Sequence, residues 1–282
     1  MCLGLKITLI TLGSLFGAAV LFFLAFLYLS APGRRPRVME KYKKIKYAHR
    51  GLHGESIPEN SLAAFAEAKR AGYGVELDVR LSRDGRLVVF HDDTLLRMCG
   101  VDGRVSDYTY GELSKMRLLG TDEKIPLFSQ VLDLLGGEVA LLVEIKMKTG
   151  DTRVAEETLL EIKDYNGPLI VESFNPFALR VVKKARPDIP RGILSMNYMN
   201  EEKHKGKLLY RLLKNLCLNF LMRPDFLSYR AEDSGDKALR LIRRLFATPT
   251  LAWTVTSAEE EKRVTEAGFD SVIFEDYLPN GG

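Results

Sequence analysis

The sequence predicts a closed (β/α)₈ TIM barrel that is preceded by one N-terminal transmembrane helix. Strand-like and helix-like patterns alternate over about 235 residues, which suits a barrel of eight such units. Histidine and carboxylate residues stand where predicted strands end, and a long charge-free segment precedes the first strand. Of the 282 residues, 46% are hydrophobic and 28% are charged, a globular composition that excludes a disordered chain.

The first expected element is a membrane anchor within residues 1–33. No charged side chain occurs from Ile7 to Gly33, and the apolar core Ile7–Leu29 is long enough to cross a bilayer at about 1.5 Å per residue. A cleaved signal peptide is the alternative, but such a peptide has a shorter apolar region, a more basic start and an A-x-A-like cleavage site. Only Lys6 precedes this segment and Leu29-Ser30-Ala31 ends it, so we predict an uncleaved anchor.

The next segment, residues 34–44, is predicted to be a basic juxtamembrane linker. Residues 34–50 contain one carboxylate, Glu40, and eight basic residues: Arg34, Arg35, Arg37, Lys41, Lys43, Lys44, Lys46 and Arg50. Because basic residues gather on the cytoplasmic side of membrane helices, this excess over the single Lys6 predicts a cell-membrane protein with a cytoplasmic catalytic domain. The linker would lie against anionic lipid headgroups or, as the alternative, would only be solvated.

The rest of the chain is mildly acidic. Of the 41 Lys and Arg residues nine lie at or before Arg50, whereas 36 of the 37 Asp and Glu residues follow it. The net charge of +4 therefore does not indicate nucleic-acid binding, and we expect no nucleic-acid partner. Cys2, Cys99 and Cys217 have no C-x-x-C spacing, so neither a disulfide framework nor a thiolate zinc site is predicted.

The barrel domain is expected to span residues 45–282, with Ile45–Ala48 as its first strand. Asn60 is expected to cap the first helix, because apolar residues follow it at helical spacing. Gly74–Leu81 alternates between apolar and polar residues, and Leu87–Phe90 returns beside it as the extra strand of a hairpin.

Six further strands bring the number of β units to eight, which closes a parallel sheet into a barrel. They are Val139–Lys146, Leu169–Ser173, Gly192–Ser195, Phe226–Tyr229, Leu251–Val255 and Ser271–Phe274. Helical patterns such as Thr152–Asp164 and Phe177–Ala185 separate them. The pattern Glu201–Met222 has basic residues followed by a dense apolar run, so it is either an ordinary amphipathic barrel helix or a helix that rests on a membrane.

Residues with catalytic chemistry gather at the predicted C-terminal strand ends, where barrels of this class have their active sites. They are His49, Arg50, Glu76, Asp78, His91, Glu144 and Lys146. Three carboxylates inside an apolar barrel are costly to bury without a cation, and their oxygen atoms suit a hard divalent metal. Two histidines beside such a site can act as general acid and general base near neutral pH.

From about Tyr47 to Tyr277 the order and spacing of these residues resemble the glycerophosphodiester phosphodiesterase family, whose fold is a TIM barrel of the phospholipase C-like phosphodiesterase type. The matching segments are His49-Arg50-Gly51, Pro58-Glu59-Asn60-Ser61, Glu76-Leu77-Asp78-Val79, Asp84-Gly85, Val88-Val89-Phe90-His91-Asp92, Ile125-Pro126-Leu127, Glu144-Ile145-Lys146, Ser173-Phe174, Trp253-Thr254-Val255 and Gly268-Phe269-Asp270-Ser271-Val272-Ile273. Each match is weak alone, but together they are highly specific.

The resemblance implies a phosphoric diester hydrolase with one divalent metal ion, Mg²⁺ or Ca²⁺. The implied metal ligands are Glu76, Asp78 and Glu144, the implied acid/base pair is His49 and His91, and the implied phosphate-binding residues are Arg50 and Lys146. A metal and two cationic side chains aimed at a phosphodiester would stabilise the charge that grows on its oxygen atoms in the transition state. Trp253 either stacks against the substrate at the barrel mouth or packs in the core.

The expected reaction is the hydrolysis of glycerophosphodiesters to glycerol 3-phosphate and an alcohol. Attack by the substrate's own neighbouring hydroxyl would give a cyclic phosphate that water then opens. One alternative is phospholipase D-type cleavage of lysophospholipids or phospholipids at the membrane, and another is a catalytically idle barrel that binds phosphodiesters. The expected partners are a small phosphodiester and the membrane, through the N-terminal helix and the basic linker.

Some positions depart from the family pattern. Ser61 stands where Thr is usual, Thr256 where Asn is frequent, and Glu275 where Thr is common, so the resemblance does not define the far side of the pocket. Residues 99–124 correspond to a small inserted segment that caps the barrel mouth in the family.

Three other residues are assigned on general grounds. Glu59 is either a metal ligand or a group beside the ligands, or an acidic first-turn residue that complements the dipole of the first helix. His53 and His204 are expected to be surface residues.

Overall fold

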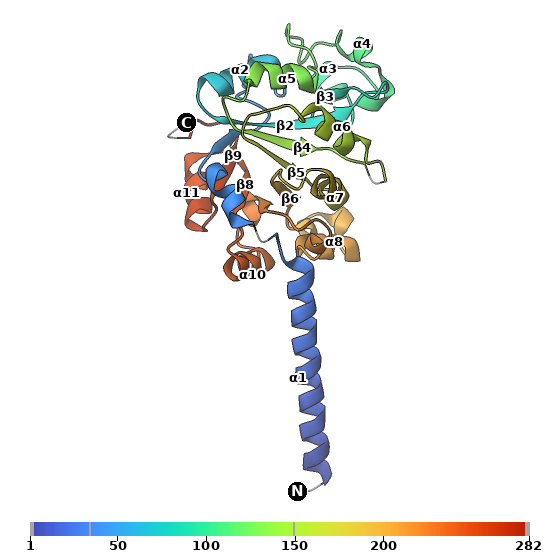
Figure 1. The fold of residues 1–282 in the computed structure, drawn as a ribbon, viewed down its shortest axis with the longest axis vertical. Helices are drawn as coiled ribbons and strands as arrows, with labels where there is room; N and C mark the ends of the chain where they lie inside the picture. Colours follow the sequence, from blue (N-terminus) through green and yellow to red (C-terminus); the bar gives the residue numbers. More distant parts are fainter. Residues whose placement is uncertain (1–2, 34, 149, 280–282) are drawn as a thin grey trace.

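Eight parallel strands form a closed barrel in the computed structural model, which describes residues 3–33, 35–148 and 150–279 (Figure 1). They are β1 (Lys46–Ala48), β2 (Gly74–Leu81), β4 (Leu141–Ile145), β5 (Leu169–Ser173), β6 (Arg191–Ser195), β7 (Phe226–Arg230), β8 (Thr250–Val255) and β9 (Ser271–Phe274). The order is β1-β9-β8-β7-β6-β5-β4-β2, and a pairing between β1 and β2 closes the ring. The predicted fold is confirmed, and each of these strands starts within two residues of its predicted start.

One more strand, β3 (Leu87–Val89), pairs with β2 in the antiparallel direction and is the predicted extra strand of the hairpin. Val79 pairs with Val89, so the chain leaves β3 close to the C-terminal end of β2. This return brings His91 back to the mouth of the barrel.

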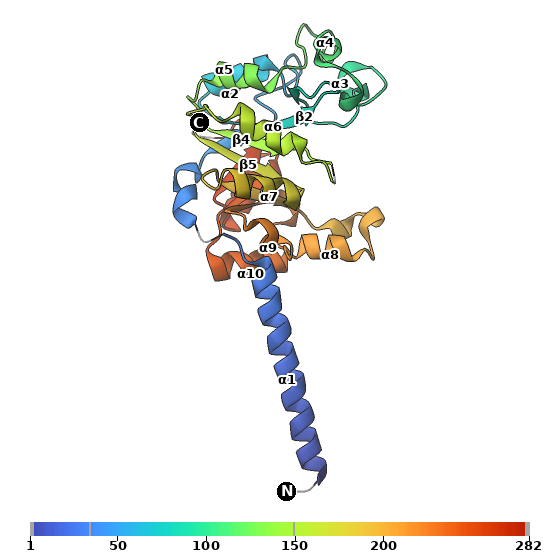
Figure 2. The same ribbon diagram turned by 45° about the vertical axis from the view of Figure 1, so that its right-hand side comes forward.

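Helices lie between the strands and cover the outside of the barrel (Figures 1 and 2). The longer ones are α2 (Leu62–Arg70), α5 (Phe128–Leu135), α6 (Arg153–Glu161), α7 (Pro176–Ala185), α8 (Leu208–Lys214), α10 (Lys237–Phe246) and α11 (Ala258–Glu266). The short ones are α3 (Leu96–Cys99), α4 (Tyr110–Leu113), α9 (Asn219–Met222) and the 3-10 helices η1 (Pro36–Tyr42), η2 (Val105–Asp107), η3 (Tyr198–Asn200), η4 (Glu202–His204) and η5 (Ala231–Asp233). The helical pattern predicted over Glu201–Met222 is therefore divided among η4, α8 and α9.

The first helix of the barrel begins one residue later than predicted. Ser61, not Asn60, is the N-cap of α2, because its hydroxyl accepts a hydrogen bond from the backbone N–H of Ala64 at 3.1 Å. Asn60 has a positive φ of 54° and turns its side chain to the barrel mouth, where it donates to Asp78 at 2.9 Å. The prediction was wrong because both residues can cap a helix and only the backbone turn distinguishes them.

The barrel interior has an apolar layer and, closer to the C-terminal ends of the strands, an acidic layer. Leu142 and Ile170 belong to the buried interior cluster, and the residues two positions further along the same strands are Glu144 and Glu172. Successive residues of a strand alternate between faces, so these carboxylates also point into the barrel. Gly192 leaves room for the interior packing, since a Cβ there would lie 2.1 Å from the ring of Phe226.

The segment between β3 and α5 contains the predicted insertion, residues 99–124, and has its own apolar cluster. Leu95, Met98, Val105 and Leu113 are buried in this cluster together with Val88 of the hairpin. The segment therefore packs on β3, beside the site where His91 lies.

The N-terminal helix α1 (Leu3–Ser30) projects away from the barrel (Figures 1 and 2). It has a mean hydropathy of 2.3 over its most apolar window, and none of that window is buried by the rest of the chain. This helix is long and apolar enough to cross a membrane, and a signal sequence would have the same properties. Met1 and Cys2 lie outside the described residues.

The barrel binds the end of α1 directly. Asn219 donates from Nδ2 to the carbonyl of Ser30 at 2.8 Å, and Arg223 donates from Nη1 to the carbonyls of Tyr28 and Ala31, each at 2.9 Å. Carbonyl groups in the last turn of a helix lack partners within the helix, so these bonds cap α1.

The basic linker is partly built into the barrel. Arg35 forms an ion pair with the buried Asp225 at 2.6 Å, whereas Arg34 lies outside the described residues. Met39 and Tyr42 of η1 are only 1% and 3% exposed and pack with the barrel interior. The linker is thus not a purely solvated segment.

Candidate active site

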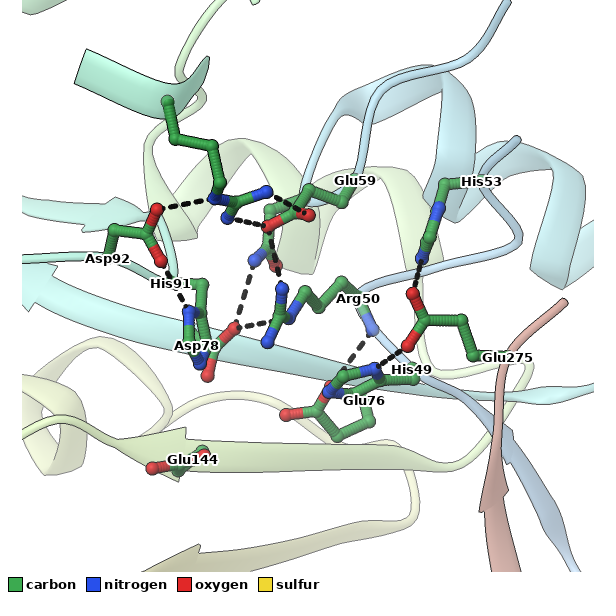
Figure 3. A network of polar contacts seen from close by, with 12 residues as sticks. His49, Arg50, His53, Glu59, Glu76, Asp78, His91, Asp92, Glu144 and Glu275 are labelled. Carbon is green, nitrogen blue, oxygen red and sulfur yellow. Dashed lines mark hydrogen bonds and ion pairs between the residues drawn. The ribbon is translucent and has the colours of Figure 1, made fainter. Parts of the chain in front are cut away.

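The strand ends bring the predicted site residues together at one mouth of the barrel (Figure 3). His49 follows β1, Glu76 and Asp78 lie on β2, His91 follows β3, and Glu144 lies on β4. In the parallel register Asp78 pairs with Glu144, so the two carboxylates stand at the same height in neighbouring strands. The shared face that period-two spacing predicts for β2 is therefore present.

Three buried carboxylates form the centre of the site. Oxygen atoms of Glu76, Asp78 and Glu144 all lie within 4.8 Å of one another, and the residues are 2%, 1% and 7% exposed. Oxygen-only donor sets of this kind suit hard divalent cations. The Nζ atom of Lys146 lies 3.0 Å from Oδ1 of Asp78 and 2.8 Å from Oε2 of Glu144, which shows that this position attracts positive charge.

The three carboxylates differ in their electrostatic surroundings. Burial and the nearby charges of Asp78 and Glu144 raise the pKa of Glu76 well above its ordinary value. Burial also acts to raise the pKa of Asp78, but the charges of Lys146 and Arg50 outweigh it and lower this pKa. Negative charge is therefore least compensated at Glu76.

A fourth carboxylate, Glu172, lies next to this trio and was missed by sequence reasoning. It pairs in register with Glu144 across β4 and β5 and is only 1% exposed. Burial and the charge of Glu144 raise the pKa of Glu172 well above its ordinary value. The pattern that could have revealed it is the alternation from Ile170 to Glu172, which repeats the alternation from Leu142 to Glu144.

His49 is held by Glu275 (Figure 3). Its Nδ1 atom lies 2.6 Å from Oε2 of Glu275, which follows the last strand, β9. Burial lowers the pKa of His49, and the hydrogen bond to Glu275 opposes this shift only in part. At neutral pH the imidazole is therefore neutral, with the Nδ1 proton directed to the carboxylate and Nε2 left as a proton acceptor.

The other oxygen of Glu275 lies beside a second histidine. Nε2 of His53 is 3.4 Å from Oε1 of Glu275, and the His53 side chain is only 15% exposed. The prediction that His53 is a surface residue was wrong. The tight turn at Gly51, which has a φ of +82° and packs against Ala64, directs the following loop inward.

His91 is held by a carboxylate in the same way. Its Nδ1 atom lies 2.7 Å from Oδ1 of Asp92, and Nε of Arg97 lies 2.6 Å from the other oxygen of Asp92. Burial lowers the pKa of His91 to about 4, although the charge of Asp78 acts in the opposite direction. Both candidate acid/base histidines are thus neutral near pH 7.

Arg50 connects the trio to the rim of the site. Its backbone N–H donates to Oε2 of Glu76 at 2.9 Å, its Nη1 donates to Glu59 at 2.9 Å, and its Nε lies 3.6 Å from Oδ2 of Asp78. Arg97 also donates to Glu59, at 2.7 Å. Glu59 is therefore an ion-pair partner of two arginines, not a member of the carboxylate trio or an acidic residue within the first turn of α2.

Trp253 lies near the end of β8 and contacts Phe174 in an edge-to-face arrangement, with ring centroids 5.4 Å apart. It is partly exposed and packs on the interior cluster. Its Nε1 atom is buried and has no hydrogen-bond partner among the residues that the structure describes. Trp253 thus combines a packing role with an unused donor.

His204 lies away from the site and is buried, so the prediction of a surface position was wrong. It is 8% exposed and stacks on Tyr210, with ring centroids 3.7 Å apart. Tyr198 contacts both rings, so the segment between β6 and β7 has an aromatic cluster of its own.

Comparisons with known proteins agree with this arrangement. The model of the Glycerophosphoryl diester phosphodiesterase family matches residues 49–277. A glycerophosphodiester phosphodiesterase of Caldanaerobacter subterraneus is 32% identical over 249 residues, which cover 83% of this chain and 95% of that protein. A lysophospholipase D of Rattus norvegicus is 33% identical over 44% of this chain and 43% of that protein.

Among solved structures, this chain is similar to a phosphodiesterase of Oleispira antarctica in complex with its product, sn-glycerol-3-phosphate. The two are 25% identical with a TM-score of 0.69, and the match covers 84% of this chain and 94% of that one. The similarity extends over the whole barrel.

Proposed function

Because the chain belongs to the glycerophosphoryl diester phosphodiesterase family, we propose that the residues at its barrel mouth hydrolyse glycerophosphodiesters to glycerol 3-phosphate and an alcohol. One observation carries the assignment of the site. Two histidines, each held at Nδ1 by a carboxylate, flank three buried carboxylates whose oxygen atoms lie within 4.8 Å of one another. A barrel that only bound phosphodiesters would not need this arrangement.

Glu76, Asp78 and Glu144 would hold one divalent metal ion, in agreement with the metal dependence of the family. Their oxygen-only donor set fits both Mg²⁺ and Ca²⁺. When bound, the ion would neutralise part of the negative charge on the phosphate oxygens. Arg50 and Lys146 would bind the remaining oxygens, exchanging some of their present contacts with the carboxylates for the substrate.

His49 and His91 would move the protons. In the first step one imidazole accepts the proton of the attacking hydroxyl while the O–P bond forms. The other imidazole, neutral in the free site near pH 7, first takes up a proton and then donates it to the leaving alcohol oxygen as the P–O bond breaks. If the attacking group is the neighbouring hydroxyl of the glycerol, the product is a cyclic phosphate. Water then opens this ring, and the two histidines exchange roles.

Glu275 and Asp92 would act as positioning residues. Each carboxylate accepts a hydrogen bond from Nδ1–H of its histidine, at 2.6 Å and 2.7 Å, and so leaves Nε2 free for the substrate. Trp253 would close the opposite side of the pocket and could donate its unpaired Nε1–H to the substrate.

The test uses the full chain with glycerophosphocholine, glycerophosphoethanolamine and glycerophosphoglycerol. We expect release of glycerol 3-phosphate with Mg²⁺ or Ca²⁺ and its loss with a chelator. The double variant Glu76→Gln/Glu144→Gln is the matched control for contaminating activity. Absence of glycerol 3-phosphate with either metal, from protein shown to be folded, would contradict the proposal.

A second candidate is phospholipase D-type cleavage of lysophospholipids. The observation in its favour is a cleft that begins at Glu144 and Lys146, inside the site itself, and continues between apolar walls. Helix α1 also favours a substrate that is found at membranes, since we propose that this helix is an uncleaved anchor in the cell membrane with the barrel on its cytoplasmic side.

A further inference from the structure

A cleft of about 550 Å³ leads away from the metal-binding carboxylates. Its inner end is formed by Glu144 and Lys146, which belong to the site already described. Its outer walls are formed by Phe174 in the loop that joins β5 to α7, by Phe177 in the first turn of α7, and by Leu209 and Leu213 of α8. The cleft is therefore charged at one end and apolar at the other.

The apolar end exposes large side chains to solvent. Phe177 is 47% exposed and Leu209 is 55% exposed, and the neighbouring Leu208 is 68% exposed. Apolar side chains grouped around an open cleft mark a binding surface more often than isolated ones do. Glycerol and a small polar alcohol would need only the charged end, so they do not account for the apolar walls.

The position of α8 relates the cleft to the membrane anchor. Residues 208–223 contribute Leu209 and Leu213 to the cleft wall, and the end of this segment, Asn219 and Arg223, holds the last turn of α1. In both views α8 lies at the side of the barrel from which α1 emerges (Figures 1 and 2). The apolar end of the cleft is thus next to the place where a membrane surface would lie.

The charges around α8 agree with that location. Lys203, Lys205, Lys207 and Arg211 are all exposed. Exposed basic residues beside exposed leucines are typical of a segment that rests on the headgroups of an anionic membrane. A lipid that leaves the bilayer at this point would meet the apolar walls before it reached Lys146.

We propose that this cleft binds the single long acyl or alkyl chain of an amphiphilic phosphodiester, such as a lysophospholipid, that enters from the membrane side of the barrel. The inference rests on the proposed function, because the phosphodiester must reach the carboxylates and histidines while its chain lies between α7 and α8. A substrate with this shape has one charged end and one apolar end, as the cleft has. Leu209 and Phe177 then determine specificity without touching the reacting atoms.

The experiment measures kcat/KM of the full chain, held in amphipol with saturating metal, for glycerophosphocholine and for hexanoyl, octanoyl and decanoyl lysophosphatidylcholine below their micelle concentrations. We expect kcat/KM to rise by up to about fourfold for each added methylene, the equivalent of about 0.8 kcal/mol of buried chain. Leu209→Ser and Phe177→Ser should flatten this dependence and leave glycerophosphocholine hydrolysis unchanged. Leu160→Ser is the matched control, because this leucine on α6 is 59% exposed and does not line the cleft.

Each other outcome is decisive. If glycerophosphocholine is hydrolysed but chain length has no effect, the inference is wrong and the proposed function stands. If chain length matters equally in wild type, Leu209→Ser and Phe177→Ser, the chain binds elsewhere and the inference is also wrong. A dimer that Leu209→Ser dissociates, without any dependence on chain length, would assign the apolar face to a second copy instead. If no phosphodiester is hydrolysed, the proposed function itself fails.

Discussion

Nδ1 of His49 lies 2.6 Å from Oε2 of Glu275, although the two residues are 226 positions apart in the chain. His49 follows the first strand and Glu275 follows the last, and β1 pairs with β9 in the closed barrel. The contact therefore forms only when the barrel closes. It links the closure of the fold to the orientation of one candidate catalytic imidazole.

Replacing Glu275 with Gln should lower kcat by at least about 10-fold, because the amide cannot stabilise the imidazolium of His49 as a carboxylate does. Loss of the negative charge should also lower the pKa of His49 further, so the acidic limb of the kcat profile should move to lower pH. The pH dependence of kcat in wild type and variant measures this shift. His53→Ala, which removes the weaker contact of Glu275, should have a smaller effect; an unchanged profile in Glu275→Gln would show that the pair has no catalytic role.

His49→Ala and His91→Ala should each reduce kcat by about 10²- to 10⁴-fold, the usual contribution of a general acid or base. Neither substitution removes a large buried apolar group, so the thermal unfolding curve and the metal affinity should stay close to those of wild type. Activity, unfolding and metal titration on the same preparations provide the comparison. Retention of more than about a tenth of the activity in both variants would contradict the assigned roles.

Glu76→Gln, Asp78→Asn and Glu144→Gln should each weaken metal binding by at least about 10-fold, as measured by calorimetric titration. Glu172→Gln is the matched control: it neutralises a buried carboxylate beside the trio but not in it, so its effect should be smaller. Equal affinities in wild type and all three trio variants would remove these residues as ligands.

Without metal, the Glu76→Gln and Asp78→Asn variants should differ in thermal stability in opposite directions from wild type. Glu76→Gln should raise Tm without metal, because it removes a charge that burial and its acidic neighbours disfavour. Asp78→Asn should lower Tm, because Asp78 is paired with Lys146 and lies near Arg50. Thermal unfolding with excess chelator gives both values, and a lower Tm for Glu76→Gln would contradict this account of repulsion in the trio.

Activity should persist well below pH 6.5, the ordinary pKa of histidine. Burial lowers the pKa of His91 to about 4, so the imidazole that must accept a proton stays neutral as the pH falls through 6.5. Only when the pH approaches the lowered pKa does protonation remove the base and reduce kcat/KM. The pH profile of kcat/KM at saturating metal shows where activity falls on the acidic side. A fall centred at pH 6.5 would show that burial does not lower the pKa of the histidine that acts as the base.

The excess of basic residues after α1 predicts that the C-terminus faces the cytoplasm. A fluorescent reporter fused after Gly282 should therefore fold and be active inside the cell, while an alkaline phosphatase fused there should be inactive. The same fusion should keep the full length of the chain, because α1 is predicted to remain uncleaved. Active phosphatase, or a product shortened by the length of α1, would contradict the topology or the anchor.

The sequence predicts those parts of the site that depend on local pattern. Alternation along β2 places Glu76 and Asp78 on one face, and the ends of β1 and β3 place His49 and His91 at the mouth. These positions follow from strand geometry alone, so no tertiary contact is needed to expect them.

The parts that sequence reasoning missed depend on contacts between distant segments. His53 and Glu275 meet only through the closed barrel, and no spacing rule connects them. Met39 and Tyr42 stand among charged residues, so their burial beneath the barrel could not be read from composition. Glu172 is different, since its alternating pattern was visible but belonged to no recognised motif.

The bonds from Asn219 and Arg223 to the end of α1 have a geometric consequence for the whole molecule. With α1 in a bilayer, these bonds would hold the barrel against the end of the helix and so at a constant height above the lipid surface. The mouth of the barrel would then stay at the same distance from the membrane while the protein diffuses laterally. A substrate in the adjacent leaflet would reach it by two-dimensional diffusion in the membrane. A dissolved phosphodiester would reach it by three-dimensional diffusion through the solution.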